Sequence, residues 1–379
     1  MKILVSTSLL SPYRVDWLNE LGKYEEVTIL YLEEENNERN KEWLEKRPEN
    51  CKYKLMKGVS LPKIGKISLD VLRELKRKKY DIIILDGYGY STQLINIFSL
   101  NKKKKMYFVN VDGAVPKRNE KQIVRFLKKA FLSKVPYFLC GSYETGNILV
   151  GYGSDLKRII HHPFTSLYKR DIYKDVISFS DKISLRKKLE IKEKYMVISV
   201  GRFSYLNGYG KGYDVLLKAA ERLKKLDIGW YIIGGKPTDE FAKMKKEMKL
   251  ENVHFVDFKK KEELKEYYRA SDIFTLMTIG DVWGLVINEA MACGLPVITT
   301  DKCVAGVELV ENGVNGYIIP VGDAQSLVNC VQKILKIEGM VEKMGHHSLE
   351  KIQDYTIEDM VRIHISKFKE ILNDRVILN

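Results

Sequence analysis

Short apolar segments alternate with amphipathic segments along almost the whole chain. In the first half, strand-like apolar runs occupy 2–6, 27–31, 81–85, 106–111 and 137–140, and helix-like stretches occupy 13–23 and 69–78. The pattern restarts with strand-like runs at 195–200, 229–233, 253–256, 273–276 and 296–299, and helix-like stretches at 215–226, 261–270 and 285–292. Such alternation is typical of β-α-β units around a parallel sheet. We predict an α/β protein with two Rossmann-like, doubly wound domains at 1–165 and 170–356, facing each other across a cleft.

Length and composition narrow the class of protein. A chain of 379 residues exceeds the ~250–300 residues that one hydrophobic core usually serves, which favours two domains. The longest apolar runs are strand-sized and fall short of the ~18–20 residues that a membrane-spanning helix needs. The first residues enter a strand-like run without a signal-peptide cleavage site, so we expect a cytoplasmic location. The five cysteines form no CxxC pair and no zinc-like cluster, so we expect reduced thiols and no metal.

The charge is unevenly distributed. Residues 1–170 contain 32 basic and 19 acidic side chains, whereas residues 171–379 contain 32 and 31, and the formal net charge of the whole chain is +14. A basic first domain fits a nucleic-acid binder, a protein that rests on an anionic membrane, or a basic face that is only solvated.

One predicted helix, residues 121–132, concentrates this charge. Its basic side chains share one face, and its apolar side chains Ile123, Phe126, Leu127 and Ala130 share the opposite face. The basic side chains are Lys121, Arg125, Lys128 and Lys129. Two interpretations are open: a helix packed on the core with a solvated basic side, or a patch that binds a membrane surface or an acceptor there.

The segment 281–296 is the most informative about chemistry. Asp281 precedes a glycine turn, and Glu289 lies inside a helix that we expect to start near Gly284 and to end at Gly294. The unbonded N–H groups at such a helix start can hold a phosphate, and Glu289 would lie about 7–8 Å further along the axis. This spacing suits a nucleotide sugar: the diphosphate would lie between Asp281 and Glu289, and each carboxylate could accept hydrogen bonds from sugar hydroxyls. The alternative is a capped amphipathic helix with one solvated glutamate.

Two further loops follow predicted strands. Arg202 and Lys211 lie on the loop after 195–200, where two cations could neutralise a diphosphate. Gly234 and Gly235 form a glycine turn after 229–233, a common feature that is weak evidence alone.

These residues together resemble the family 4 glycosyltransferases of the GT-B fold, over nearly the whole length. That family carries two glutamates separated by seven residues, followed by Ala-Met-Ala-x-Gly-x-Pro-Val. Here Asp281 and Glu289 hold the two acidic positions, and residues 289–300 match the rest closely. Arg202 and the Lys211-Gly212 pair match the diphosphate-binding residues of the family, and Ser11-Pro12-Tyr13-Arg14 resembles polysaccharide-assembly members.

The resemblance implies a role for each residue. Arg202 and Lys211 would bind the donor diphosphate, together with backbone N–H groups from Trp283 and from Gly284, Leu285 and Val286. Glu289 would bind the ribose, Asp281 the donor sugar, and the turn at Gly234 and Gly235 the nucleotide. The family retains anomeric configuration and generally needs no metal or other cofactor. The resemblance also implies that the last helix, about 357–379, packs back on the first domain.

Two departures from the family pattern concern the predicted catalytic residues. Asp281 is one methylene shorter than the family glutamate. Many members also carry a histidine after a strand of the first domain, whereas this chain has no histidine before His161. Asp112 stands where we expect its replacement, and a simple turn aspartate before Gly113 is the alternative.

We therefore predict a retaining glycosyltransferase that moves a hexose from a nucleotide-diphosphate donor to a glycan or lipid-linked acceptor, with no nucleic-acid partner. It would act in the cytoplasm, peripherally on the inner face of the cell membrane, in surface polysaccharide assembly. The alternatives are a non-catalytic nucleic-acid-binding protein, and an epimerase or phosphorylase that acts on sugar nucleotides.

Overall fold

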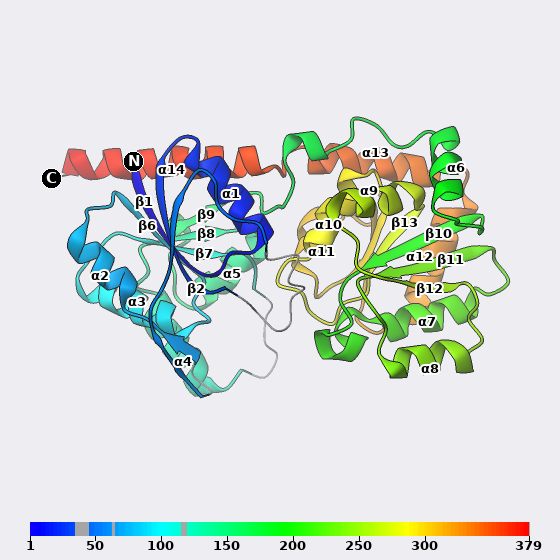
Figure 1. Ribbon diagram of the computed structural model, residues 1–379, viewed down its shortest axis with the longest axis horizontal. Helices are drawn as coiled ribbons and strands as arrows, with labels where there is room; N and C mark the ends of the chain where they lie inside the picture. Colours follow the sequence, from blue (N-terminus) through cyan, green and yellow to red (C-terminus); the bar gives the residue numbers. More distant parts are fainter. Residues whose placement is uncertain (35–44, 63–64, 115–119, 379) are drawn as a thin grey trace. The chain divides into compact units, whose positions relative to one another are not determined.

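The computed structural model describes residues 1–34, 45–62, 65–114 and 120–378, and it shows parallel sheets flanked by helices (Figure 1). The chain divides into two compact units. The first unit comprises Met1–Ser166 together with the C-terminal segment from Thr356, and the second unit comprises Leu167–Tyr355.

The first unit contains a seven-stranded parallel sheet in the order β3-β2-β1-β6-β7-β8-β9. Its strands are β1 (Lys2–Leu9), β2 (Glu26–Glu33), β3 (Lys52–Leu55), β6 (Ile82–Asp86), β7 (Phe108–Val111), β8 (Tyr137–Cys140) and β9 (Ile159–His161), and a separate antiparallel pair joins β4 (Val59–Leu61) to β5 (Gly65–Ile67). Its helices are α1 (Pro12–Gly22), α2 (Asp70–Arg77), α3 (Ser91–Lys102), α4 (Gln122–Leu132), α5 (Tyr143–Gly151) and α14 (Ile357–Leu378). The strand order reverses between β1 and β6, where a doubly wound sheet places its functional loops.

The helix α14 packs on the first unit. Its His364 ring meets Trp17 of α1 edge to face, with 5.7 Å between ring centroids. Its Phe368 ring lies 4.8 Å from that of Phe108 in β7. Both His364 and Phe368 are buried, so these contacts belong to the core of the unit.

The second unit contains a six-stranded parallel sheet in the order β12-β11-β10-β13-β14-β15. Its strands are β10 (Tyr195–Val200), β11 (Ile228–Ile233), β12 (Val253–Val256), β13 (Ile273–Leu276), β14 (Val297–Thr300) and β15 (Gly316–Ile319). Its helices are α6 (Phe179–Lys188), α7 (Tyr213–Arg222), α8 (Asp239–Glu247), α9 (Lys261–Ala270), α10 (Leu285–Ala292), α11 (Val304–Leu309), α12 (Ala324–Lys336) and α13 (Met340–Ile352). The large buried rings of Tyr213, Trp230 and Phe241 share one apolar core.

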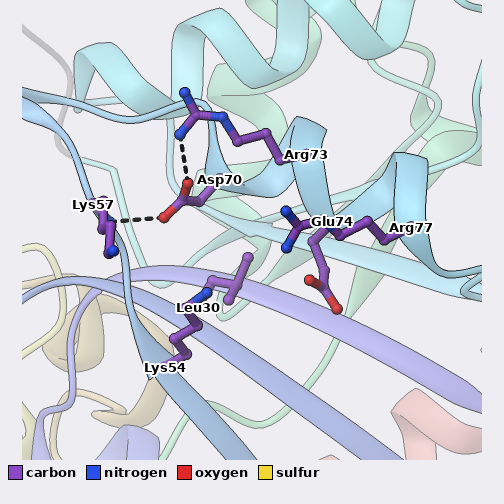
Figure 2. Close-up of a pocket in the computed structure, with 7 residues that line it drawn as sticks. All are labelled: Leu30, Lys54, Lys57, Asp70, Arg73, Glu74 and Arg77. Atoms are coloured by element: carbon purple, nitrogen blue, oxygen red, sulfur yellow. Dashed lines mark hydrogen bonds and ion pairs between the residues drawn. The ribbon is translucent and has the colours of Figure 1, made fainter.

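A hollow of about 300 Å³ lies in the first unit near α2 and the neighbouring strands, and Figure 2 shows its lining. Asp70 accepts hydrogen bonds from the backbone N–H of Lys57 and from Arg73, and Glu74 accepts one from Tyr80. The acidic groups of this hollow are therefore already bonded to the protein, and none of the predicted site residues lines it. No helix in the described ranges combines the length and the apolar character needed to cross a membrane.

Candidate functional site

The loops after β10 and β11 touch at the carboxyl edge of the second sheet. Gly234 has a φ of +151°, and a Cβ atom there would lie 2.2 Å from the carbonyl oxygen of Gly201. The N–H of Gly201 in turn donates to the carbonyl of Ile233 at 2.9 Å. The predicted glycine turn therefore lies directly against the loop that carries Arg202, and a side chain at position 234 would separate the two.

A second contact places Lys211 beside the loop that follows β13. Gly212 has a φ of +68°, and a Cβ atom there would lie 2.0 Å from the carbonyl oxygen of Met277. The hydroxyl of Thr278 donates to the carbonyl of Gly210 at 2.9 Å, and the N–H of Ile279 donates to the same oxygen at 3.2 Å. Lys211 is thus held by backbone contacts on both sides of it.

Lys211 and Asp281 form an ion pair. The Nζ atom of Lys211 lies 2.7 Å from Oδ2 of Asp281, and the side chains are only 15% and 19% exposed. The other carboxylate oxygen of Asp281 accepts the N–H of Trp283 at 3.3 Å. Asp281 therefore connects the lysine loop to the start of α10. Lys211 and Asp281, which come from two separate segments of the chain, therefore meet within the second unit.

The helix α10 starts directly after Gly284, as the sequence predicted. Gly284 precedes the helix with a φ of +102°, and a Cβ atom there would lie 2.7 Å from the Sγ atom of Cys303. The N–H groups of Gly284, Leu285 and Val286 belong to the first turn, where an α-helix offers no internal acceptor. The helix dipole adds partial positive charge at the same place. An anion beside Lys211 could accept hydrogen bonds from this turn.

Trp283 contributes differently from its neighbours. Its ring is buried, and its indole N–H donates to Oδ1 of Asn288 at 2.8 Å. The structure therefore uses the Trp283 side chain to hold the turn against α10, and its backbone N–H is bonded to Asp281.

Glu289 lies half-buried on α10, and its Oε2 atom accepts a hydrogen bond from the hydroxyl of Tyr268 at 3.2 Å. Tyr268 belongs to α9 and is buried, and burial raises the pKa of its hydroxyl well above its ordinary value, with a further contribution from Glu289. This tyrosine stays a proton donor and orients the carboxylate. Sequence alone does not reveal this tyrosine, because 21 residues separate it from Glu289 and no motif connects them.

Asp112 lies in the first unit, within a buried cluster of charged groups. The Arg14 guanidinium bridges Asp86 and Asp112, with 2.7 Å from Nη2 of Arg14 to Oδ2 of Asp112. The Tyr13 hydroxyl donates to the same Asp112 oxygen at 3.2 Å, and Asn110 donates to the other at 2.8 Å. Burial raises the pKa of Asp112, and the charge of Arg14 opposes that rise. Asp112 was predicted as a site residue, whereas its partners Arg14 and Asp86 are apparent only in the fold.

The helix 121–132 is present as α4, but its apolar face does not pack on the core. Ile123 and Phe126 are 68% and 69% exposed, and Leu127 is 50% exposed. The interpretation as a core-packed helix with a solvated basic side is therefore wrong. Lys121, Arg125 and Lys129 are exposed as expected, whereas Lys128 is ion-paired with Glu120.

Part of the chain matches a known protein family, and the chain is similar to two named relatives. Residues 181–351 match the family described as "Glycosyl transferases group 1". A 41.2 kDa protein of the cps region of Klebsiella pneumoniae is 26% identical over 72% of this chain and 74% of its own length. The amylovoran biosynthesis glycosyltransferase AmsK of Erwinia amylovora is 31% identical over 42% of this chain and 41% of its own length.

The fold of one solved structure covers nearly the whole chain. The crystal structure of Anabaena Alr3699/HepE in complex with UDP covers 98% of this chain and 100% of its own, with a TM-score of 0.78 and 16% sequence identity. The same protein has also been solved in complex with UDP-glucose. At this identity the likeness concerns the fold, which is the GT-B fold with two Rossmann-like domains.

Proposed function

Because the chain is a glycosyltransferase whose residues 181–351 match the group 1 family, we propose that it moves a sugar from a nucleotide-diphosphate donor to a glycan or lipid-linked acceptor. We place this reaction in the assembly of a surface polysaccharide, as the names of the two curated relatives suggest. One observation carries the donor assignment: the Lys211–Asp281 ion pair lies at the start of α10, beside N–H groups that can donate hydrogen bonds to an anion.

The donor is proposed to bind along α10. Its diphosphate would lie against the first turn and draw Lys211 away from Asp281, while Arg202 supplies a second cation from the adjoining loop. Glu289, oriented by Tyr268, would accept hydrogen bonds from the ribose hydroxyls. Asp281 would then be released from its ion pair and could accept hydrogen bonds from the donor sugar. The UDP complexes of the Anabaena protein support a nucleotide diphosphate as the ligand class.

The proposed reaction breaks the bond between the anomeric carbon and the diphosphate oxygen and forms a bond from that carbon to the acceptor oxygen. Negative charge grows on the leaving diphosphate, and Lys211, Arg202 and the α10 N–H groups would stabilise it. If the acceptor attacks from the side that the diphosphate leaves, configuration is retained and a phosphate oxygen takes the acceptor proton. The two cations perform the charge neutralisation in this scheme, so we propose that no metal is needed.

Thermal-shift measurements with UDP, GDP and ADP test the donor site. A bound nucleotide at about 100 times its Kd should raise Tm by roughly 5 °C. The variant Lys211→Ala should abolish the shift. Lys218→Ala is the matched control, because Lys218 pairs with Asp214 on the exposed side of α7. Equal shifts in both variants would contradict the assignment.

Turnover assays separate the transferase from the alternatives. The transferase releases nucleotide diphosphate only when an acceptor is present, whereas an epimerase alters the donor without one. NMR of the product's anomeric proton tests retention, and unchanged turnover in EDTA tests metal independence.

A further inference from the structure

The helix α4 carries its apolar side chains on the outside of the first unit. Ile123, Phe126 and Leu127 are half to two-thirds exposed, and Val124 beside them is 39% exposed. Three of them recur at the spacing that places side chains on one face of a helix. A helix on the surface of a globular domain normally turns such a face toward the core. In α4 the face is turned toward the surroundings.

Two side chains on the opposite side of α4, Lys128 and Leu132, attach the helix to the unit. Lys128 is ion-paired with Glu120, donates to the Tyr152 hydroxyl at 3.3 Å, and lies 5.0 Å from the centre of the Tyr152 ring. Leu132, one turn further on, is buried in the core. Rotating α4 to bury its apolar face would break these contacts, so its outward orientation is part of the fold.

The helix α3 extends the apolar surface. Phe98 of α3 is 59% exposed, and its ring centroid lies 6.5 Å from that of Phe131 on α4. Figure 1 draws these two helices in the same part of the first unit. We call the exposed side chains Phe98, Ile123, Val124, Phe126 and Leu127 the α4 patch. Contiguous apolar surface rimmed by polar groups marks a binding surface.

The surroundings of the α4 patch are strongly basic. Residues 91–134 contain 11 basic side chains and two acidic ones. Both acidic groups are bonded within the protein, Asp112 to Arg14 and Glu120 to Lys128. Lys121, Arg125 and Lys129 are exposed on α4, and Lys102 to Lys105 are exposed at the end of α3. An apolar face with a lysine- and arginine-rich border complements a bilayer that contains anionic lipids.

We propose that the α4 patch inserts its apolar side chains into the headgroup region of an anionic lipid bilayer, while the surrounding lysines and arginines bind the lipid phosphates. This attachment is more than the electrostatic contact expected from the basic residues alone, because it requires Phe126 and its apolar neighbours. A nucleic acid would use the positive charge but would leave these side chains in water. The inference does not depend on the identity of the donor or the acceptor.

Flotation of the full-length protein with vesicles tests the proposal. The protein should bind vesicles that contain both phosphatidylglycerol and phosphatidylcholine. It should bind vesicles of phosphatidylcholine alone much more weakly. The double variant F126S/L127S should lower the partition coefficient at least about tenfold, because two buried apolar side chains are lost. The triple variant K121Q/R125Q/K129Q should lower it as well and reduce its dependence on salt. Phe179→Ser is the control, since Phe179 is 81% exposed in the other unit.

A second readout separates insertion from adhesion. In Phe126→Trp, the new fluorophore should shift to the blue and become protected from acrylamide on adding anionic vesicles, whereas Phe179→Trp should not change. Unchanged flotation of F126S/L127S would overturn the proposal. A dimer in light scattering that F126S/L127S converts to a monomer would also overturn it. Binding of an oligonucleotide in place of vesicles would overturn it too. The nucleotide-induced thermal shift should persist in F126S/L127S, so a failed donor assignment would be recognised separately.

Discussion

The Nζ atom of Lys211 lies 2.7 Å from Oδ2 of Asp281, across a separation of 70 residues in the chain. The pair holds a cation and a carboxylate at the start of α10 before any donor is bound. In the proposed donor site, a diphosphate would compete with Asp281 for Lys211. The ion pair would then link donor binding to the release of a carboxylate.

Asp281→Asn separates the two halves of this pair. Without the competing carboxylate, Lys211 should bind a nucleotide diphosphate at least as tightly as before. Turnover should fall by about 10- to 100-fold, because the contact with the donor sugar is altered. Titration calorimetry and steady-state kinetics measure the two effects. Asp281→Glu should recover most of the turnover, and weakened diphosphate binding in Asp281→Asn would count against the competition.

Tyr268→Phe tests the orientation of Glu289. Removing one hydrogen bond, worth about 1 kcal/mol, should weaken donor binding roughly fivefold and leave the ring packing of α9 intact. Tyr267→Phe is the matched control on the same helix. The KM for the donor in both variants provides the comparison. A similar change in the two would show that Tyr268 has no specific role.

Asp112→Asn tests the predicted catalytic role of Asp112. Two carboxylates share the charge of Arg14 in this cluster, so neutralising one leaves a balanced Arg14–Asp86 pair. We expect the free energy of unfolding to change by less than about 2 kcal/mol, whereas turnover falls at least about 100-fold if Asp112 contacts the acceptor hydroxyl. Urea unfolding and initial rates give the two quantities. Wild-type turnover in this variant would refute the catalytic role.

His364 should make the first unit sensitive to acid. Its Nε2 atom lies 3.1 Å from Nδ1 of His162, and burial lowers the pKa of His364 to about 3. The unfolded chain, with an ordinary histidine pKa near 6.5, binds the proton more readily. The contribution of His364 to the free energy of unfolding is therefore fully present above about pH 6.5. It is lost as the pH falls toward 3, at up to about 1.4 kcal/mol per pH unit.

Urea unfolding from pH 7 to pH 4 measures this slope. His364→Phe should be less stable at neutral pH, since His162 loses its partner, but should show a shallower decline in acid. His347→Asn on α13 is the control and should follow the wild-type slope. An unchanged slope in His364→Phe would exclude this histidine as the source.

The sequence predicted the central strands because they are buried on both faces and therefore read as continuous apolar runs. Ile228–Ile233 is buried throughout and was predicted almost to its ends. The strand β3, Lys-Tyr-Lys-Leu, is almost wholly exposed, and its polar alternation gave no such signal. Position at the edge of a sheet is a tertiary property, which explains this omission.

The same distinction applies to the candidate site. Asp281, Gly284 and Glu289 lie within one segment, so their spacing alone placed Asp281 before the helix, Gly284 at its start and Glu289 inside it. The partners Tyr268 and Arg14 come from other elements and became visible only with the fold. Periodicity predicted α4, but it could not show which face is attached, because the contact of Lys128 with Glu120 and Tyr152 decides that.

The helix α14 completes the first unit after the whole of the second unit has intervened in the chain. During synthesis, residues 167–355 therefore leave the ribosome before the helix that covers Trp17 and Phe108 exists. The nascent first unit must wait with that surface open while the second unit folds. The first unit can therefore be completed only after translation of α14 is finished.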